Sequence, residues 1–334
     1  MPDDFDPRRY ATPASQSPRY VTARKARGLY AALVVVLAGI VLVCAGLLGR
    51  YLLDAYNARL AGDELRALYH ESETDAPEAP ALPSVTETPP PAATSAPEAA
   101  PVVAQAAAQA ATQGSESRLY PNNPSFRVSE KMTKLRGENF DIVGWLSIDS
   151  LLDEAVVQRD NSYYLTHDYQ GKRNYNGAIF LDEGCDLRTV PDQLLVHGHN
   201  MKTGAMFGCL ARYKSKGAAF LREHGFITLD TLYESAEYAV FAVAEVSTAP
   251  SKSHYFSFVG HAQFFNQDEM DRYVARAKAL SLYQIDIDVQ PGDRLLTLAT
   301  CIGDNSDERL LVMARMLRPG EDRMALQLAL YSAR

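Results

Sequence analysis

The longest run of apolar residues lies near the N-terminus of the chain. Residues 28–49, GLYAALVVVLAGIVLVCAGLLG, contain no charged side chain. As a helix this segment would be about 33 Å long, enough to cross a hydrocarbon core of about 30 Å. The pattern therefore predicts a transmembrane helix over residues 28–49. A cleaved signal peptide is the alternative, but its apolar stretch is usually only about 7 to 15 residues long.

Two different patterns follow this run. Residues 50–70 carry apolar side chains at roughly helical spacing, which predicts a juxtamembrane helix, at Leu52, Tyr56, Leu60, Leu65 and Leu68. Residues 71–115 contain eight of the chain's 18 prolines and six acidic residues, but no Lys, Arg or aromatic residue. Such a composition buries too little apolar surface to offset the entropy of ordering. Residues 71–117 are therefore expected to form a Pro/Ala-rich disordered linker, or stalk.

From residue 118 onward, short apolar segments are separated by turn signals, which predicts a folded domain over residues 118–334. Strands are predicted over residues 144–148, 178–181, 193–199, 226–229, 237–246, 294–301 and 309–316. Helical patterns fit residues 129–136, 205–213 and 267–279. Many short strands with few helices predict a mainly β fold, namely a closed or partly closed barrel with helices on its outside.

The distribution of charge predicts the orientation in the membrane and argues against nucleic acid as a partner. Residues 1–27 contain six basic residues against three acidic ones, a net charge of +3. By the positive-inside rule, this tail is expected to be cytoplasmic, with the chain after residue 50 exported by a single-pass membrane protein. The whole chain has 33 Lys+Arg against 41 Asp+Glu, a net charge of -8. Without a basic face to neutralise phosphates, it is not expected to bind nucleic acid.

The four cysteines show no metal-binding or disulfide framework. Cys44, Cys185, Cys209 and Cys301 form no CxxC pair and no His/Cys cluster at zinc-ligand spacing, so no structural metal is expected. Cys44 lies deep in the apolar run and is interpreted as membrane-facing. Cys185 and Cys209 could pair in an oxidising exterior or remain buried thiols, and the sequence leaves both possibilities open.

Cys301 is a candidate nucleophile. It ends the predicted strand RLLTLATC, a seven-residue polar loop follows, and Arg309 opens the next strand, RLLVMARM. If these strands pair as a hairpin, Cys301 and Arg309 face each other within cross-strand reach. A guanidinium beside a thiol favours the reactive thiolate, and it can later hold the oxyanion of a tetrahedral intermediate.

Two histidines are candidates for proton transfer to and from such a nucleophile. The segment HGHN ends the apolar strand QLLV and places His197 and His199 on one face of it. Either imidazole could supply the acid/base function of a Cys-His pair. Each signal is weak alone, because a cysteine or histidine at a strand end is more often structural.

Together, these motifs resemble those of the sortases, membrane-anchored cysteine transpeptidases of Gram-positive bacteria, and specifically class B. The segment TLATC resembles the TLxTC nucleophile motif, and Arg309 matches the catalytic arginine that opens the next strand. GHNMKTGAMF, residues 198–207, is similar to the histidine motif, in which the histidine before Asn is catalytic, which selects His199 over His197. The likeness covers about residues 128–317. In the family, Tyr is commoner at position 197 and Ser at position 299.

The resemblance implies a sortase-like closed β-barrel of about eight strands, with peripheral helices, that needs no cofactor. Its substrates would be secreted proteins bearing a C-terminal sorting signal, cleaved through a thioester acyl-enzyme. The new carboxyl end would pass to an amine of a peptidoglycan precursor or a pilin lysine. Cys301 would be the nucleophile, His199 the general acid/base and Arg309 the oxyanion and substrate-positioning residue. Residues that would contact substrate or support these three are Thr300, Asn200 and His197.

Two other functions are weighed against this one. A different exported cysteine peptidase, such as an L,D-transpeptidase, would carry a Ser-His-Gly-Cys type motif, whereas here Thr300 precedes Cys301. A non-catalytic surface-displayed binding module would not need Cys, His and Arg at three converging strand ends. The sequence therefore favours an extracellular catalytic domain held at the cell membrane, in contact with lipid through residues 28–49.

Overall fold

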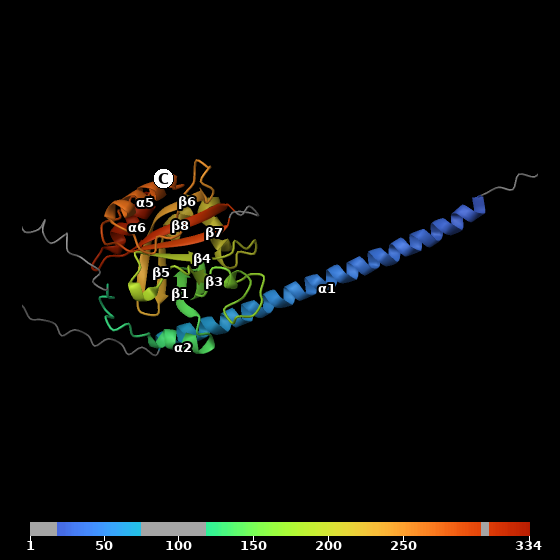
Figure 1. Cartoon of the computed structure of the whole chain (residues 1–334), viewed down its shortest axis with the longest axis horizontal. Coiled ribbons are helices and arrows are strands. Elements are labelled where there is room, and N and C mark those ends of the chain that lie inside the picture. Colours follow the sequence, from blue (N-terminus) through green and yellow to red (C-terminus); the bar gives the residue numbers. More distant parts are fainter. Residues whose placement is uncertain (1–18, 75–117, 302–306) are drawn as a thin grey trace, which may run out of the picture. The chain divides into compact units, whose positions relative to one another are not determined.

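A closed β-barrel forms the centre of the folded domain. The computed structural model describes residues 19–74, 118–301 and 307–334. Within these residues, eight strands close into one sheet in the order β1-β2-β3-β4-β7-β8-β6-β5 (Figure 1). They are β1 (Ile142–Ile148), β2 (Leu152–Val157), β3 (Ile179–Leu181), β4 (Gln193–His197), β5 (Phe226–Thr231), β6 (Ser235–Ser247), β7 (Leu295–Cys301) and β8 (Glu308–Met316). The predicted closed barrel of about eight strands is confirmed.

The barrel core follows from the strand sequences. Buried Leu, Val and Ile side chains occupy successive strands, and Leu194, Val196, Leu296 and Leu298 are almost completely buried where β4 lies beside β7. β-Branched and large apolar residues favour such a pleated, packed surface. Most neighbouring strands are antiparallel, but β2 pairs with β3 and β4 pairs with β7 in parallel. Parallel pairing brings the carboxyl ends of β4 and β7 to the same edge of the sheet.

Short helices surround the barrel. They are α2 (Glu130–Glu138), α3 (Ala211–Ser215), α4 (Ala218–Glu223), α5 (Gln267–Leu280) and α6 (Arg323–Tyr331). The Asn266 side chain accepts a hydrogen bond from the Glu269 N–H and so caps α5. Met270, Tyr273, Val274 and Ala277 are buried at helical spacing on α5, which packs against β6. The segment predicted as one helix over residues 205–213 is instead a 3₁₀ turn (Phe207–Leu210) followed by α3.

A long helix, α1 (Arg19–Thr74), runs through the predicted transmembrane and juxtamembrane segments without a break. Its stretch Tyr30–Tyr51 has a mean hydropathy of 3.0 and is long and apolar enough to cross a membrane, by length and composition. The chain divides into two compact units, residues 1–57 and residues 58–334. The predicted linker, apart from its first four residues in α1, and most of the predicted cytoplasmic tail lie outside the described residues.

The end of α1 belongs to the same compact unit as the barrel. Leu65 and Tyr69 are buried, and the Tyr69 ring stacks on Trp145 of β1 with ring centroids 4.3 Å apart. The Tyr69 hydroxyl donates a hydrogen bond to Asp230 Oδ2 over 2.6 Å, and Arg66 Nη2 lies 2.5 Å from Glu154 Oε1. The folded unit therefore includes residues 58–74 in addition to the predicted domain.

Replacing Tyr69 with Ala should destabilise this unit. Loss of a buried large aromatic ring costs about 3 to 5 kcal/mol, because the cavity it leaves refills only partly. The fluorescence of Trp145, the chain's single tryptophan, measures this in a urea titration of the full chain in detergent. The matched control is Tyr56→Ala, since Tyr56 on the same helix is 59% exposed. Equal unfolding midpoints for the two variants would contradict the expectation.

Candidate active site

Three strand ends meet at one edge of the barrel. In the ladder between β7 and β8, Cys301 is directly opposite Arg309. In the parallel ladder between β4 and β7, His197 pairs with Ala299, and the Gly198 N–H donates to the Ala299 carbonyl over 3.2 Å. The ladder ends at His197, and His199 follows two residues later, at the edge of the barrel where Cys301 ends β7. Neighbouring strands are about 4.8 Å apart, so the backbones of Cys301 and Arg309 lie close together at this edge.

The His199 ring is held by the segment between β2 and β3. Its Nε2 lies 2.7 Å from the carbonyl oxygen of Leu165. A carbonyl oxygen can only accept a hydrogen bond, so Nε2 carries the proton. The other ring nitrogen, Nδ1, is thereby assigned as the atom that can take up and release a proton.

Gly177 allows the Leu165 carbonyl and the imidazole to approach each other. Its φ of +62° lies in the left-handed region, which favours glycine. A Cβ atom at this position would lie 2.5 Å from the Tyr164 carbonyl oxygen and 3.1 Å from Cδ2 of His199. Any side chain here would therefore displace the backbone that orients His199.

Arg309 lies at the start of β8, which is fastened to the segment after β6. Its Nη1 donates to the Glu308 carbonyl oxygen over 3.0 Å. Glu308 Oε2 in turn lies 2.8 Å from His254 Nε2. The Thr248 N–H donates to the Asp307 carbonyl oxygen over 2.8 Å. These contacts fix the backbone from which the guanidinium extends.

His197 faces away from this cluster toward a buried carboxylate. Its Nε2 donates to Asp182 Oδ2 over 2.9 Å, and its ring stacks on Phe180 with centroids 5.1 Å apart. Burial raises the pKa of Asp182, but hydrogen bonds from His197, the Gly184 N–H and Asn161, together with the His197 charge, hold it below its usual range. Asp182 is therefore ionised at neutral pH. The sequence analysis did not single it out.

The other two candidates differ in their surroundings. Thr300 is only 2% exposed, and its hydroxyl has no hydrogen-bond partner among the described residues. Such burial favours a packing role over contact with substrate. Asn200 is half-buried and forms an isolated β-bridge with Met206, directly after His199.

The remaining cysteines outside the apolar run are buried thiols. Among the cysteines whose side chains the structure describes, Cys185 and Cys209 are both free, which answers the question the sequence left open. Burial raises the pKa of each thiol to about 11. Because a thiol is a poor nucleophile in its protonated form, neither competes with Cys301 at neutral pH.

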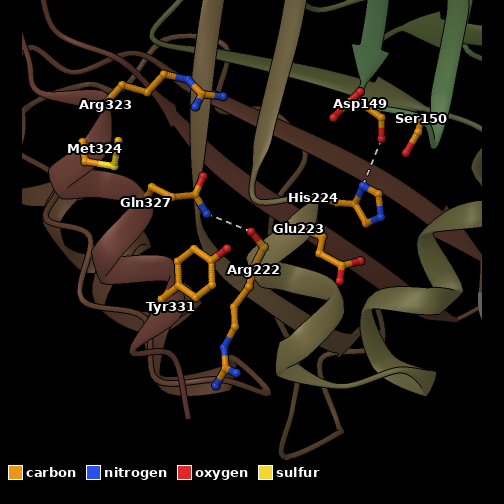
Figure 2. Close-up of a pocket in the computed structure, with 9 residues that line it drawn as sticks. All are labelled: Asp149, Ser150, Arg222, Glu223, His224, Arg323, Met324, Gln327 and Tyr331. Carbon is orange, nitrogen blue, oxygen red and sulfur yellow. Dashed lines mark hydrogen bonds between the residues drawn. The ribbon is translucent and has the colours of Figure 1, made fainter.

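A separate pocket of about 610 Å³ lies between α4 and α6 (Figure 2). Its polar groups bond to one another: Gln327 Nε2 donates to the Arg222 carbonyl oxygen over 2.9 Å, and His224 Nδ1 lies 3.0 Å from the Asp149 carbonyl oxygen. The residues that line this pocket include none of the residues at the carboxyl ends of β4 and β7. No group of three or more metal-ligating side chains exists in the described parts of the chain.

Comparisons with known proteins agree with this geometry. The Sortase domain family matches residues 147–317. Sortase B of Listeria monocytogenes is 30% identical over 199 residues, covering 58% of this chain and 77% of that protein. Sortase B of Staphylococcus aureus is 27% identical, covering 58% of this chain and 75% of that protein.

Solved structures extend the likeness to three dimensions. The Staphylococcus aureus sortase B-substrate complex aligns with a TM-score of 0.52 and 26% identity, over 57% of this chain and 87% of that one. Sortase B from Bacillus anthracis aligns with a TM-score of 0.56 and 24% identity, over 79% and 97%, a likeness of fold. The family match spans half of the chain and includes Cys301, His199 and Arg309. The chain therefore belongs to the sortase family of cysteine transpeptidases and, within it, to class B.

Proposed function

We propose that this chain cleaves the C-terminal sorting signal of secreted proteins and transfers the new carboxyl end to an amine. The acceptor would be a peptidoglycan precursor of the cell wall or a pilin lysine. The observation that supports the proposal is the strand pairing, in which Cys301 is opposite Arg309 and β4, which leads to His199, runs parallel to β7. A nucleophile, a proton carrier and a fixed cation are the groups that acyl transfer from a peptide requires.

The reaction would proceed in two acyl-transfer steps. The Cys301 thiolate attacks the scissile carbonyl, and the tetrahedral intermediate collapses to a thioester as the peptide nitrogen leaves. Nδ1 of His199 gives this nitrogen its proton. The neutral imidazole then takes a proton from the incoming amine, which attacks the thioester and releases Cys301. Over the full reaction, the acyl group passes from the leaving amine to the entering amine, and one proton passes the other way through His199.

Arg309 would stabilise charge in both steps. Its guanidinium favours the thiolate before attack and donates hydrogen bonds to the oxyanion of each tetrahedral intermediate. The planar fork of donors can also bind the backbone of the sorting signal at two points.

The anchor completes the proposal. The stretch Tyr30–Tyr51 of α1 would span the cell membrane once, in contact with lipid. The net charge of +3 in residues 1–27 would keep the N-terminus cytoplasmic. The catalytic barrel would then work on the extracellular side, where secreted proteins and cell-wall amines are found.

The acyl-enzyme is the direct test. The full chain in detergent is mixed with a set of sorting-signal peptides, with and without an amine acceptor, and followed by intact mass spectrometry. We expect an adduct equal in mass to the N-terminal peptide fragment, which is lost on adding the amine, and which neither Cys301→Ala nor His199→Ala forms. A folded protein that forms no adduct with any peptide would instead favour a non-catalytic binding module.

Gly177→Ala should slow the reaction without unfolding the protein. The added methyl group displaces the Leu165 carbonyl, and misplacing a catalytic group by about 1 Å can cost up to about 100-fold in rate. Gly217→Ala is the control: its φ of +73° imposes similar backbone strain, but no described atom lies within 4 Å of its added Cβ. Steady-state rates and melting temperatures of both variants are measured. Similar rate losses would show that backbone strain alone is responsible.

Arg309→Lys should also be poorly tolerated, although the charge is kept. A lysine cannot reproduce the fork of donors, and loss of an oxyanion donor costs about 10²- to 10³-fold in kcat. The control is Arg323→Lys, since Arg323 forms an ion pair with Glu237 near the start of β6, whereas Arg309 pairs with Val246 near its end. The proposed role of Arg309 is refuted if both lysine variants keep the wild-type kcat.

A further inference from the structure

Asp182 collects hydrogen bonds from three segments beside the active site. It directly follows β3 and is only 6% exposed. Its Oδ2 accepts from His197 Nε2 over 2.9 Å and from Asn161 Nδ2 over 3.0 Å. Its Oδ1 accepts from the Gly184 N–H over 2.9 Å. Each carboxylate oxygen is therefore fixed by at least one donor.

Two of these bonds lead to His199 by separate routes. The first passes through His197, which ends β4 two residues before His199. The second passes through Asn161, in the segment whose Leu165 carbonyl accepts the hydrogen bond from His199 Nε2. The carboxylate thus supports both the strand that carries the catalytic imidazole and the carbonyl that orients it.

Further bonds make the second route stiff. Asn161 Oδ1 accepts from the Glu183 N–H over 2.9 Å. Gln158 Nε2 donates to the carbonyl oxygens of Asp182 and Cys185 over 3.0 and 2.7 Å. The start of the segment that ends at Leu165 is therefore bound to the turn after β3 at several points.

We infer that Asp182 is the positioning residue for His199, acting through His197 and through the segment from Asn161 to Leu165. This inference rests on the proposed acid/base role of His199 and adds to it. Only an ionised carboxylate accepts at every lone pair. An asparagine in its place must direct its NH₂ group toward one of the three donors, which breaks at least one support.

A variant of His197 tests whether this residue supports His199 or carries the proton itself. Glutamine at position 197 can still donate to Asp182 but cannot carry a proton. His197→Gln should therefore lower kcat much less than His199→Ala does, and should leave the Nε2–H form of His199 in place. A loss as large as that of His199→Ala would overturn the inference and make His197 the proton carrier.

The main test is Asp182→Asn in the full chain in detergent. We expect kcat for peptide transfer to fall about 10- to 100-fold, while KM for the donor peptide stays within about twofold, because orientation of the acid/base group is lost rather than substrate binding. Asp192→Asn is the matched control. Asp192 is 9% exposed and pairs with Arg118, but it lies at the opposite end of β4.

Melting temperatures distinguish positioning from general destabilisation. Both variants remove a buried carboxylate and should lower the melting temperature, but only Asp182→Asn should lower kcat. An equal loss of kcat in both, or a rise in KM alone for Asp182→Asn, would overturn the inference.

A second readout does not depend on activity. Long-range ¹H–¹⁵N spectra of the imidazole rings identify which nitrogen carries the proton. In wild type, His199 should show its Nε2–H form, and Asp182→Asn should mix the two tautomers while Asp192→Asn leaves them unchanged. If the wild type forms no acyl-enzyme, the proposed function fails, and these spectra still decide the link between Asp182 and His199. Unchanged His199 signals in Asp182→Asn would refute that link.

Discussion

The parallel pairing of β4 with β7 is the constraint on which the site depends. A hairpin alone brings Cys301 opposite Arg309, because antiparallel strands joined by a loop meet at the loop. His199 follows the carboxyl end of β4, and it reaches the edge where Cys301 ends β7 because β4 runs parallel to β7. Parallel neighbours need a long crossover connection, and residues 198–294 supply it with β5, β6 and three helices. Much of the barrel therefore lies in the connection that makes this parallel pairing possible.

The proposed acid/base role of His199 requires a ring that changes its charge twice in each turnover. The Leu165 carbonyl, a neutral group, fixes the orientation of the His199 ring through its hydrogen bond with Nε2. A carboxylate in direct contact would stabilise the charged form and hold the proton. In this chain the carboxylate of Asp182 bonds to His197 instead of His199. Orientation and charge are therefore supplied by different groups.

Local patterns predicted most of the strands and the residues at their ends, because β7, β8 and β4 are short apolar runs with marked turns. They did not predict β2, whose sequence LDEAVV carries two acidic residues. These acids are used by α1: Asp153 lies 2.9 Å from His70, and Glu154 binds Arg66. The sequence analysis did not single out Asp182, because its partner His197 is brought close only by the pairing of β3 with β4. Long-range contacts of this kind leave no periodic signal.

The end of α1, which packs against the barrel, determines where the folded unit begins. Thr74, where α1 ends, and Arg118, which pairs with Asp192 of the barrel, both belong to the compact unit of residues 58–334. Residues 75–117 of the predicted linker, which lie between them in the sequence, are outside the described residues. Trp145 is 1% exposed because Tyr69 covers it. A catalytic fragment cut at residue 118 would lose that cover and expose the largest side chain of the core, so the boundary of the folded enzyme lies before residue 58.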